Sequence, residues 1–297
     1  MQEAVPFHGS VRSGGPESSV IPGMMKNHVV RVAAVSDIHY SKASQGSLQS
    51  LFAEITEKAD VLVIAGDLTD FGLAEEARIL AKDVTSSLRI PAVGVLGNHD
   101  LEAGEEKEIM AILADAGVRM LDGDIYEVHG VGFAGIRGFC GGFGRGALGA
   151  WGEAVIKAFV HETINEALKL ESALARLKSE RRIAITHYAP IRETVVGEPL
   201  EIYPFLGSSR LEEPLTRFNV SAVFHGHAHK GSLEGQTSKG IPVYNVSLPL
   251  LQEQLPDRSP FRLIEVDTTP VVGENADIVE RRRTDRRSGV PVSPNGS

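Results

Sequence analysis

The chain is organised around the stretch Ala65-Gly66-Asp67-Leu68-Thr69-Asp70. It follows the largely apolar, β-branched residues 59–64, a pattern typical of a buried parallel strand. Asp67 therefore lies where that strand ends. In open α/β sheets the carboxyl ends of the strands form the edge that binds ligands, and carboxylates there commonly hold metals. We interpret Asp67 as a carboxylate that bridges two metal ions.

Four more predicted strands, at 28–36, 92–96, 182–186 and 221–224, also end in polar residues. After the first, alternation predicts that Asp37 and His39 lie on one side of an extended segment. A lone Asp-x-His pair usually marks a cap or turn, but five strand ends pool imidazoles, carboxylates and an amide at one sheet edge. Such a mixed set exceeds what one tetrahedral site needs and suits two divalent ions. The candidate residues after these four strands are Asp37, His39, Asn98, His99, His187, His227 and His229.

The remaining pattern alternates helices with strands, which predicts an α/β fold in one large domain. Helices are expected at 46–58, 72–89, 105–116, 153–180 and 208–218, and extended segments at 118–121, 125–128, 131–135, 241–246 and 261–266. We predict a disordered segment at 1–27, a single domain at 28–267 and a disordered tail at 268–297.

Composition excludes several classes of protein. The 297 residues carry a formal net charge of -9, so no basic surface indicates a long nucleic-acid partner. The single cysteine, Cys140, excludes an internal disulfide framework and favours a reducing, cytoplasmic compartment. No run of 18 apolar residues is present, so no membrane span is expected.

In order, these motifs resemble those of the calcineurin-like metallophosphoesterases: Asp-x-His, Gly-Asp, Gly-Asn-His-Asp/Glu, His and Gly-His-x-His, here spread over residues 37–229. The resemblance implies a four-layer α/β/β/α sandwich with two divalent metal ions, Mn, Fe or Zn. Carried over by position, it implies three sets of ligands: Asp37, His39 and His229 for the first ion, Asn98, His187 and His227 for the second, and Asp67 for both.

The resemblance also implies a mechanism in which a metal-bridging hydroxide attacks phosphorus in line. Two cations about 3.5 to 4 Å apart lower the pKa of such a water and neutralise the phosphoryl oxygens. His99 would stabilise the transition state or protonate the leaving oxygen, and Asp70 would orient His99 through its carboxylate. His225, just before the last ligand pair, is expected to point to the opposite face as a structural residue.

The motifs define the reaction better than the substrate. Protein phosphatases of this superfamily carry an arginine where this chain has Phe71, and the pattern looks more like that of class III cyclic nucleotide phosphodiesterases and their bacterial relatives. A small phosphodiester, with nucleotides among the candidates, is therefore favoured. The open alternatives are a phosphomonoesterase, a nuclease and a non-catalytic metal-binding scaffold.

Two segments are expected to face the substrate, at 137–150 and 188–207. The first contains the glycine-rich stretch 138–146, which is either a surface loop or a loop whose amides meet a phosphate. Arg145 and Tyr188 are the candidate substrate contacts in these two segments.

Overall fold

The computed structural model describes residues 29–269. The segments predicted to be disordered, 1–27 and 268–297, fall outside this range except for Thr268 and Thr269, as does His28 of the first predicted strand. Within residues 29–269 no helix is both long and apolar enough to cross a membrane.

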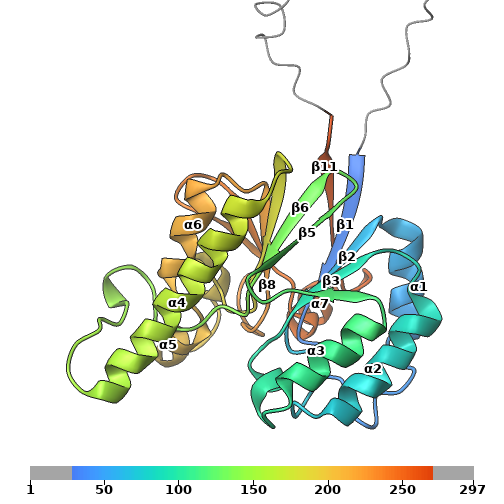
Figure 1. Cartoon of the computed structure of the whole chain (residues 1–297), viewed down its shortest axis with the longest axis horizontal. Coiled ribbons are helices and arrows are strands. Elements are labelled where there is room, and N and C mark those ends of the chain that lie inside the picture. The colour runs from blue at the N-terminus through green and yellow to red at the C-terminus, as the bar shows by residue number, and fades with distance from the viewer. Residues whose placement is uncertain (1–28, 270–297) are drawn as a thin grey trace, which may run out of the picture.

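Two β-sheets face each other at the centre of the molecule (Figure 1). The first sheet has the spatial order β11 (Arg262–Asp267), β1 (Val29–Val35), β2 (Val61–Ala65), β3 (Ala92–Val95) and β4 (Val118–Met120). The second has the order β5 (Asp124–Val128), β6 (Val131–Gly135), β7 (Arg181–Ile185), β8 (Ala222–His225), β10 (Pro242–Asn245) and β9 (Glu234–Gln236). Only β11, β5 and β9 pair antiparallel with their neighbours, so the central strands of each sheet end at a common edge.

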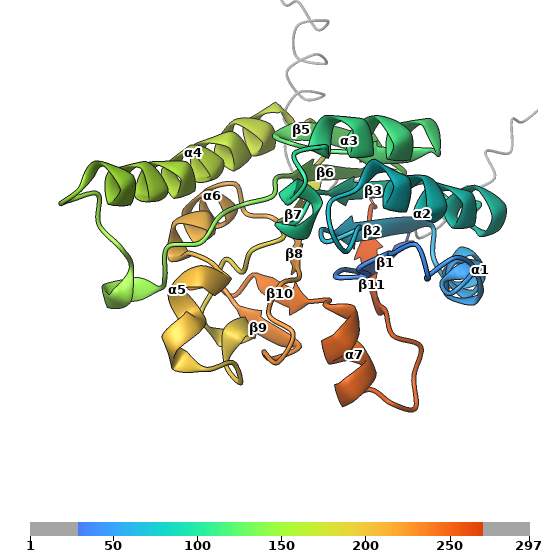
Figure 2. The same ribbon diagram turned by 90° about the horizontal axis from the view of Figure 1, so that it is seen from below.

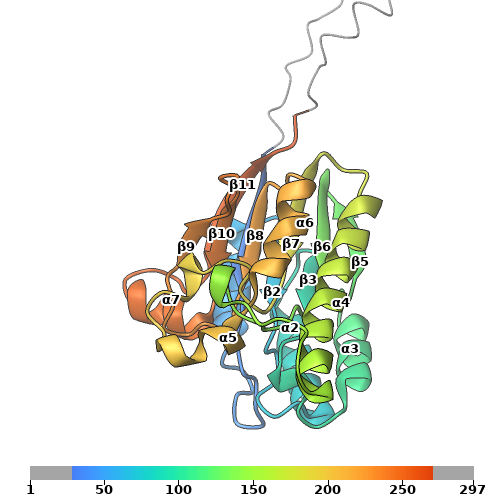
Figure 3. The same cartoon turned by 90° about the vertical axis from the view of Figure 1, so that its left-hand side faces the viewer.

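Helices cover the outer face of each sheet (Figures 2 and 3). The first sheet carries α1 (Gln49–Lys58), α2 (Ala74–Ser87) and α3 (Glu106–Asp115), and the second carries α4 (Ala154–Arg176) and α6 (Glu212–Arg217). Two short helices, α5 (Tyr203–Leu206) and α7 (Leu248–Gln254), lie near the edge where the strands end. These layers confirm the predicted four-layer α/β/β/α sandwich.

The strands bury side chains on both of their faces. In β1, Val32 and Ala34 pack between the two sheets, whereas Ala33 and Val35 pack under the helices of the first sheet. This alternation follows from the two-residue period of a strand. Because both faces of the central strands are covered, most of their residues are apolar, as the run before Asp67 indicated.

Every predicted strand is present, with ends that differ by two residues or fewer. The prediction missed β9, α5 and α7 and extended α4 too far, to residue 180. The helix ends at Arg176 because Leu177 turns extended and packs into the core, while the carboxylate of Glu127 accepts the backbone N–H groups of Lys178 and Ser179. The predicted helix at 208–218 is a 3₁₀ turn over Ser209–Leu211 followed by α6.

Candidate metal centre

The loops that follow β1, β2, β7 and β8 are hydrogen-bonded into one assembly. The N–H of Asp37 donates to the carbonyl of Gly66 at 3.0 Å, and that of Gly226 donates to the carbonyl of His187 at 3.1 Å. The two sheets are joined where the N–H of His227 donates to the Asp37 carboxylate, at 3.0 Å from Oδ2 and across 190 residues of sequence. The strand ends that the sequence singled out therefore form one site.

The backbone of this site is strained. Asp37, His39, Asp67 and His227 have φ angles of 55°, 41°, 47° and 70°, in the left-handed region that non-glycine residues rarely adopt. The expectation of an extended segment at Asp37 and His39 was thus wrong, because the chain turns sharply at both residues, although their side chains do meet. Such conformations cost on the order of 1 kcal/mol each and persist where the surrounding structure enforces them, commonly at functional sites.

Two glycines allow the loops to approach this closely. A Cβ on Gly97 would lie 2.1 Å from Oδ1 of Asp67, and one on Gly226 would lie 2.3 Å from Oδ2 of Asp37. Each buried carboxylate is therefore packed against bare backbone, and any larger residue at either position would push it away.

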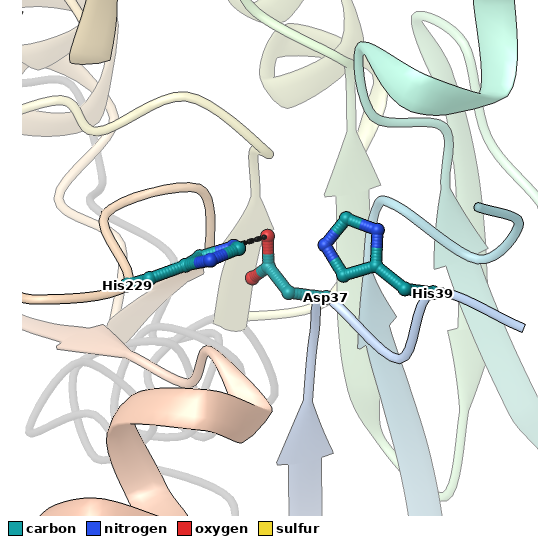
Figure 4. Close-up of side chains that lie close together, drawn as sticks. All are labelled: Asp37, His39 and His229. Atoms are coloured by element: carbon teal, nitrogen blue, oxygen red, sulfur yellow. Dashed lines mark hydrogen bonds and ion pairs between the residues drawn. The ribbon is translucent and has the colours of Figure 1, made fainter. Parts of the chain in front are cut away.

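The first group of candidate ligands is Asp37, His39 and His229, whose side chains converge in Figure 4. Nε2 of His229 lies 3.0 Å from Oδ1 of Asp37. Burial opposes ionisation of Asp37, but the hydrogen bond from His229 and the nearby imidazoles outweigh it and hold its pKa well below the usual range. Among the described residues, neither ring nitrogen of His39 has a hydrogen-bond partner although both are buried. Buried polar atoms are rarely left unpaired, and a bound cation would satisfy this ring.

The second group is Asp67, His187 and His227, with Asn98 beside them. Nδ1 of His187 donates to the carbonyl of Ala65 at 2.9 Å, which turns Nε2 toward Oδ1 of Asn98 at 2.9 Å and Oδ2 of Asp67 at 3.4 Å. Burial disfavours a charged ring, yet the charge of Asp67 prevails and raises the pKa of His187 to about 9. Without metal, the oxygens around Nε2 thus hold a proton there, and a metal ion bound at this point would displace it.

His227 completes this group in a form suited to metal binding. Burial lowers its pKa to about 4, so the ring is neutral at pH 7. Its Nε2 lies 3.1 Å from the carbonyl of Phe205 and donates to it. The proton therefore sits on Nε2, and Nδ1 keeps the lone pair that a metal ligand needs.

Asp67 lies between the two groups. Its Oδ2 is 3.9 Å from Nε2 of His39 in the first group and 3.4 Å from Nε2 of His187 in the second. Its Oδ1 accepts the backbone N–H of His99 at 2.9 Å. One carboxylate oxygen thus faces an imidazole of each group, the placement that a bridging ligand would have.

His99 stands beside the first group with one ring nitrogen held. Its ring lies 4.6 Å from that of His39, and its Nδ1 donates to the backbone carbonyl of Asp70 at 2.7 Å. This contact differs from the expected one, because the Asp70 carboxylate lies instead 3.6 Å from Nδ1 of His39. The difference arises because the chain at Asp70 turns its main chain, not its side chain, toward His99.

Asp100, the residue that ends the Gly-Asn-His-Asp motif, has a role that the sequence reasoning missed. Its carboxylate is fully buried and accepts four hydrogen bonds, from the N–H groups of Gly97, Leu68 and Thr69 and from the Thr69 hydroxyl. Burial and the charge of Asp67 raise its pKa to about 6. Asp100 therefore ties the loop after β3 to the loop after β2, a function that depends on burial and has no local signal.

The remaining candidates are placed unequally. Tyr188 is buried with its ring 4.5 Å from that of His227. Arg145 instead lines a surface pocket of 470 Å³ that contains no predicted metal ligand. His225 is buried and bonded through Nε2 to the hydroxyl of Thr194, as expected of a structural residue.

The two segments expected to face the substrate are hydrogen-bonded to each other. The N–H of Gly141 donates to the carbonyl of Pro204 at 2.7 Å, and that of Gly142 to the carbonyl of Gly207 at 2.9 Å. They therefore form a single surface next to His227, and the glycine-rich stretch is a loop within it.

Comparison with solved structures supports this fold through one neighbour with a TM-score above 0.5 and finds a weaker likeness to a second. Phosphopantetheinyl hydrolase (PptH) from Mycobacterium tuberculosis is 15% identical, with a TM-score of 0.58 over 84% of this chain and 99% of that one. TT1561 of Thermus thermophilus is 13% identical, with a TM-score of 0.48 over 81% of this chain and 100% of that one. At 15% identity the likeness to PptH shows the fold alone. No curated protein sequence matches this chain.

The family model described as calcineurin-like phosphoesterase matches residues 30–231. This range contains both groups of candidate ligands and the loops that position them. Because this match spans more than half of the chain, the chain belongs to the calcineurin-like phosphoesterase family.

Proposed function

We propose that the protein hydrolyses phosphoesters, with phosphodiesters preferred, using two divalent metal ions of the manganese, iron or zinc kind. The observation that carries this proposal is the position of Asp67 Oδ2 between one histidine of each group. The unpaired ring of His39 and the free Nδ1 of His227 supply the lone pairs that cations need. The proposed ligands are Asp37, His39, Asp67 and His229 for one ion, and Asp67, Asn98, His187 and His227 for the other.

The metals, when bound, would lower the pKa of a bound water and neutralise the phosphoryl oxygens. The protein's own contribution to the reaction lies in His99. Because its Nδ1 is held by the carbonyl of Asp70, its Nε2 is the ring atom left to contact a substrate. In its protonated form Nε2 would donate to the leaving oxygen, and the fixed ring would make that transfer geometrically reliable.

The charge of the site supports the preference for a diester. Across residues 29–269, no lysine or arginine side chain forms a hydrogen bond or ion pair with the proposed ligands or with His99. Arg137 accepts the N–H of His187 through its backbone carbonyl, but its guanidinium forms an ion pair with Glu162. A phosphomonoester dianion carries one more negative charge than a diester, and sites for such groups commonly add a guanidinium. Without that cation, the monoanionic diester is the better match.

The test compares hydrolysis of bis-p-nitrophenyl phosphate and p-nitrophenyl phosphate by manganese-reconstituted protein. We expect the diester to be cleaved faster, and Asn98→Ala to be inactive with less bound manganese by elemental analysis. Faster cleavage of the monoester would move the substrate class to phosphomonoesters. No cleavage of either ester by metal-loaded protein would support the alternative of a non-catalytic scaffold.

A further inference from the structure

A continuous series of aromatic side chains leads away from His227. The ring of Tyr188 lies 4.5 Å from that of His227, and Phe139 lies 5.8 Å from Tyr188. Phe159 of α4 follows at 5.1 Å from Phe139, and Phe205 of α5 at 6.5 Å from Phe159. Since the carbonyl of Phe205 also accepts the His227 hydrogen bond, this series begins and ends next to the metal centre.

The end of the series at Phe205 is open to solvent. The Phe205 side chain is 57% exposed although it belongs to a residue whose backbone contacts a proposed ligand. On α4, Val155 and Ile156 lie four and three residues before Phe159 and so share its side of the helix. They are 73% and 40% exposed. We call Val155, Ile156, Phe159 and Phe205 the apolar strip; the ring contact between Phe159 and Phe205 joins α4 to α5.

Single exposed apolar residues are ordinary on a protein surface, whereas a contiguous apolar patch marks a binding site. The apolar strip is contiguous with a catalytic centre, so whatever covers it lies next to the reacting phosphorus. The strip adjoins His227 of the second group, whereas the surroundings of the first group are polar: the ring of His99 lies 4.6 Å from that of His39, with Glu102 3.6 Å from its Nδ1. The leaving oxygen belongs on the His99 side, which leaves the strip for the other ester group.

We propose that the apolar strip binds an apolar non-leaving ester group of the substrate, so that the enzyme selects phosphodiesters carrying a hydrocarbon chain or ring over those with a small group. This inference rests on the proposed phosphoesterase function and narrows its substrate class. Phe205, whose carbonyl contacts His227, forms the end of the strip nearest the centre, and Ile156 lies farther along it; the buried ring of Tyr188 and the half-buried ring of Phe139 lie beneath.

The experiment uses p-nitrophenyl phosphodiesters whose second ester group is methyl, butyl or hexyl, below micelle-forming concentrations, with manganese-reconstituted protein. The leaving group and the charge stay constant, so only the apolar group varies. Complete burial of a methylene corresponds to about a fourfold gain. With partial burial on an open surface we expect about twofold for each, and kcat/KM for hexyl about 10- to 30-fold above methyl.

Variants test the location of the bound group. Phe205→Ser and Ile156→Ser should each lower the hexyl-to-methyl ratio of kcat/KM, with Phe205→Ser also lowering the butyl-to-methyl ratio because Phe205 lies nearer His227. Leu168→Ser is the matched control, since Leu168 is a 57% exposed residue of α4 that lines a different pocket, against α6. It should keep the wild-type ratio; an equal fall in the control would overturn the assignment to the strip.

Two outcomes separate this inference from the proposed function. Hydrolysis of all three esters with equal kcat/KM would overturn the apolar site and leave the phosphodiesterase activity standing. If no ester is hydrolysed, the proposed function fails, and calorimetric binding of hexyl methylphosphonate against methyl methylphosphonate tests the strip without turnover. Tighter binding of the hexyl compound, lost in Phe205→Ser, would support the strip, and equal affinities would refute it.

Discussion

The strand-end loops that carry the candidate metal ligands and the loop surface that faces them are built differently. Most of the proposed ligand side chains are held by hydrogen bonds from neighbouring loops, His39 being the exception, and four of the ligand residues are held in left-handed backbone. The surface formed by 137–150 and 188–207 is held together by backbone contacts, but its apolar side chains end in solvent. The comparison teaches that the proposed reaction would depend on a rigid, strained assembly, whereas the proposed substrate preference would depend on exposed side chains outside it.

The largest expected effect on activity comes from a substitution in the strand-end loops. His99→Ala should lower kcat by about 10²- to 10⁴-fold, the usual contribution of general acid catalysis, while metal content stays unchanged because His99 is not a proposed ligand. Steady-state kinetics and elemental analysis measure the two quantities. His161→Ala, an exposed histidine of α4, is the control. Full activity in His99→Ala would remove this residue from the mechanism.

Asp100→Asn tests whether the strand-end loops depend on their buried support. An amide nitrogen would face backbone N–H donors where a carboxylate oxygen now accepts them. We expect the free energy of unfolding of the metal-free protein to fall by about 2 to 4 kcal/mol. Urea denaturation measures it, and Asp124→Asn, on an exposed β5 residue, should change it little. Equal stability of the two variants would contradict the role given to Asp100.

Asp70→Ala separates the carboxylate from the main chain of the same residue. The carbonyl that holds His99 remains, so only the contact with Nδ1 of His39 is lost. We expect metal affinity to fall by about 10- to 100-fold, as for other groups that support a ligand histidine, with kcat at saturating metal largely retained. Asp70→Asn keeps a side-chain oxygen at this position, so its metal affinity should fall less than that of Asp70→Ala. A loss of kcat as large as that of His99→Ala would mean that the carboxylate does orient His99.

The smallest expected effect on activity comes from a substitution in the surface formed by 137–150 and 188–207. Arg145 lines a pocket that contains none of the proposed ligands, so Arg145→Ala should change kcat/KM for bis-p-nitrophenyl phosphate by less than about twofold, as for most exposed substitutions. A loss above tenfold would place Arg145 at the reacting phosphate and remove the contrast between the two regions.

The sequence alone determined the order of strands and helices and the identity of the polar residues at the strand ends. Apolar runs of the right length and period are local signals, and the turn from such a run to Asp67 or to Asn98 is visible without any tertiary contact. The order of the motifs was also enough to name the family that the match to residues 30–231 confirmed.

Tertiary structure decided the rest, because it depends on contacts between distant segments. The left-handed turns at Asp37 and His227 exist where two sheets meet across 190 residues of sequence. Nδ1 of His227 keeps its lone pair because Nε2 donates its proton to the Phe205 carbonyl of α5. Asp100 is buried because its carboxylate is bonded to the loop after β2. The apolar strip likewise joins α4 to α5, and no local sequence pattern predicts that Phe159 and Phe205 are in contact. Local periodicity specifies elements, whereas burial, tautomers and surface continuity arise only when those elements pack.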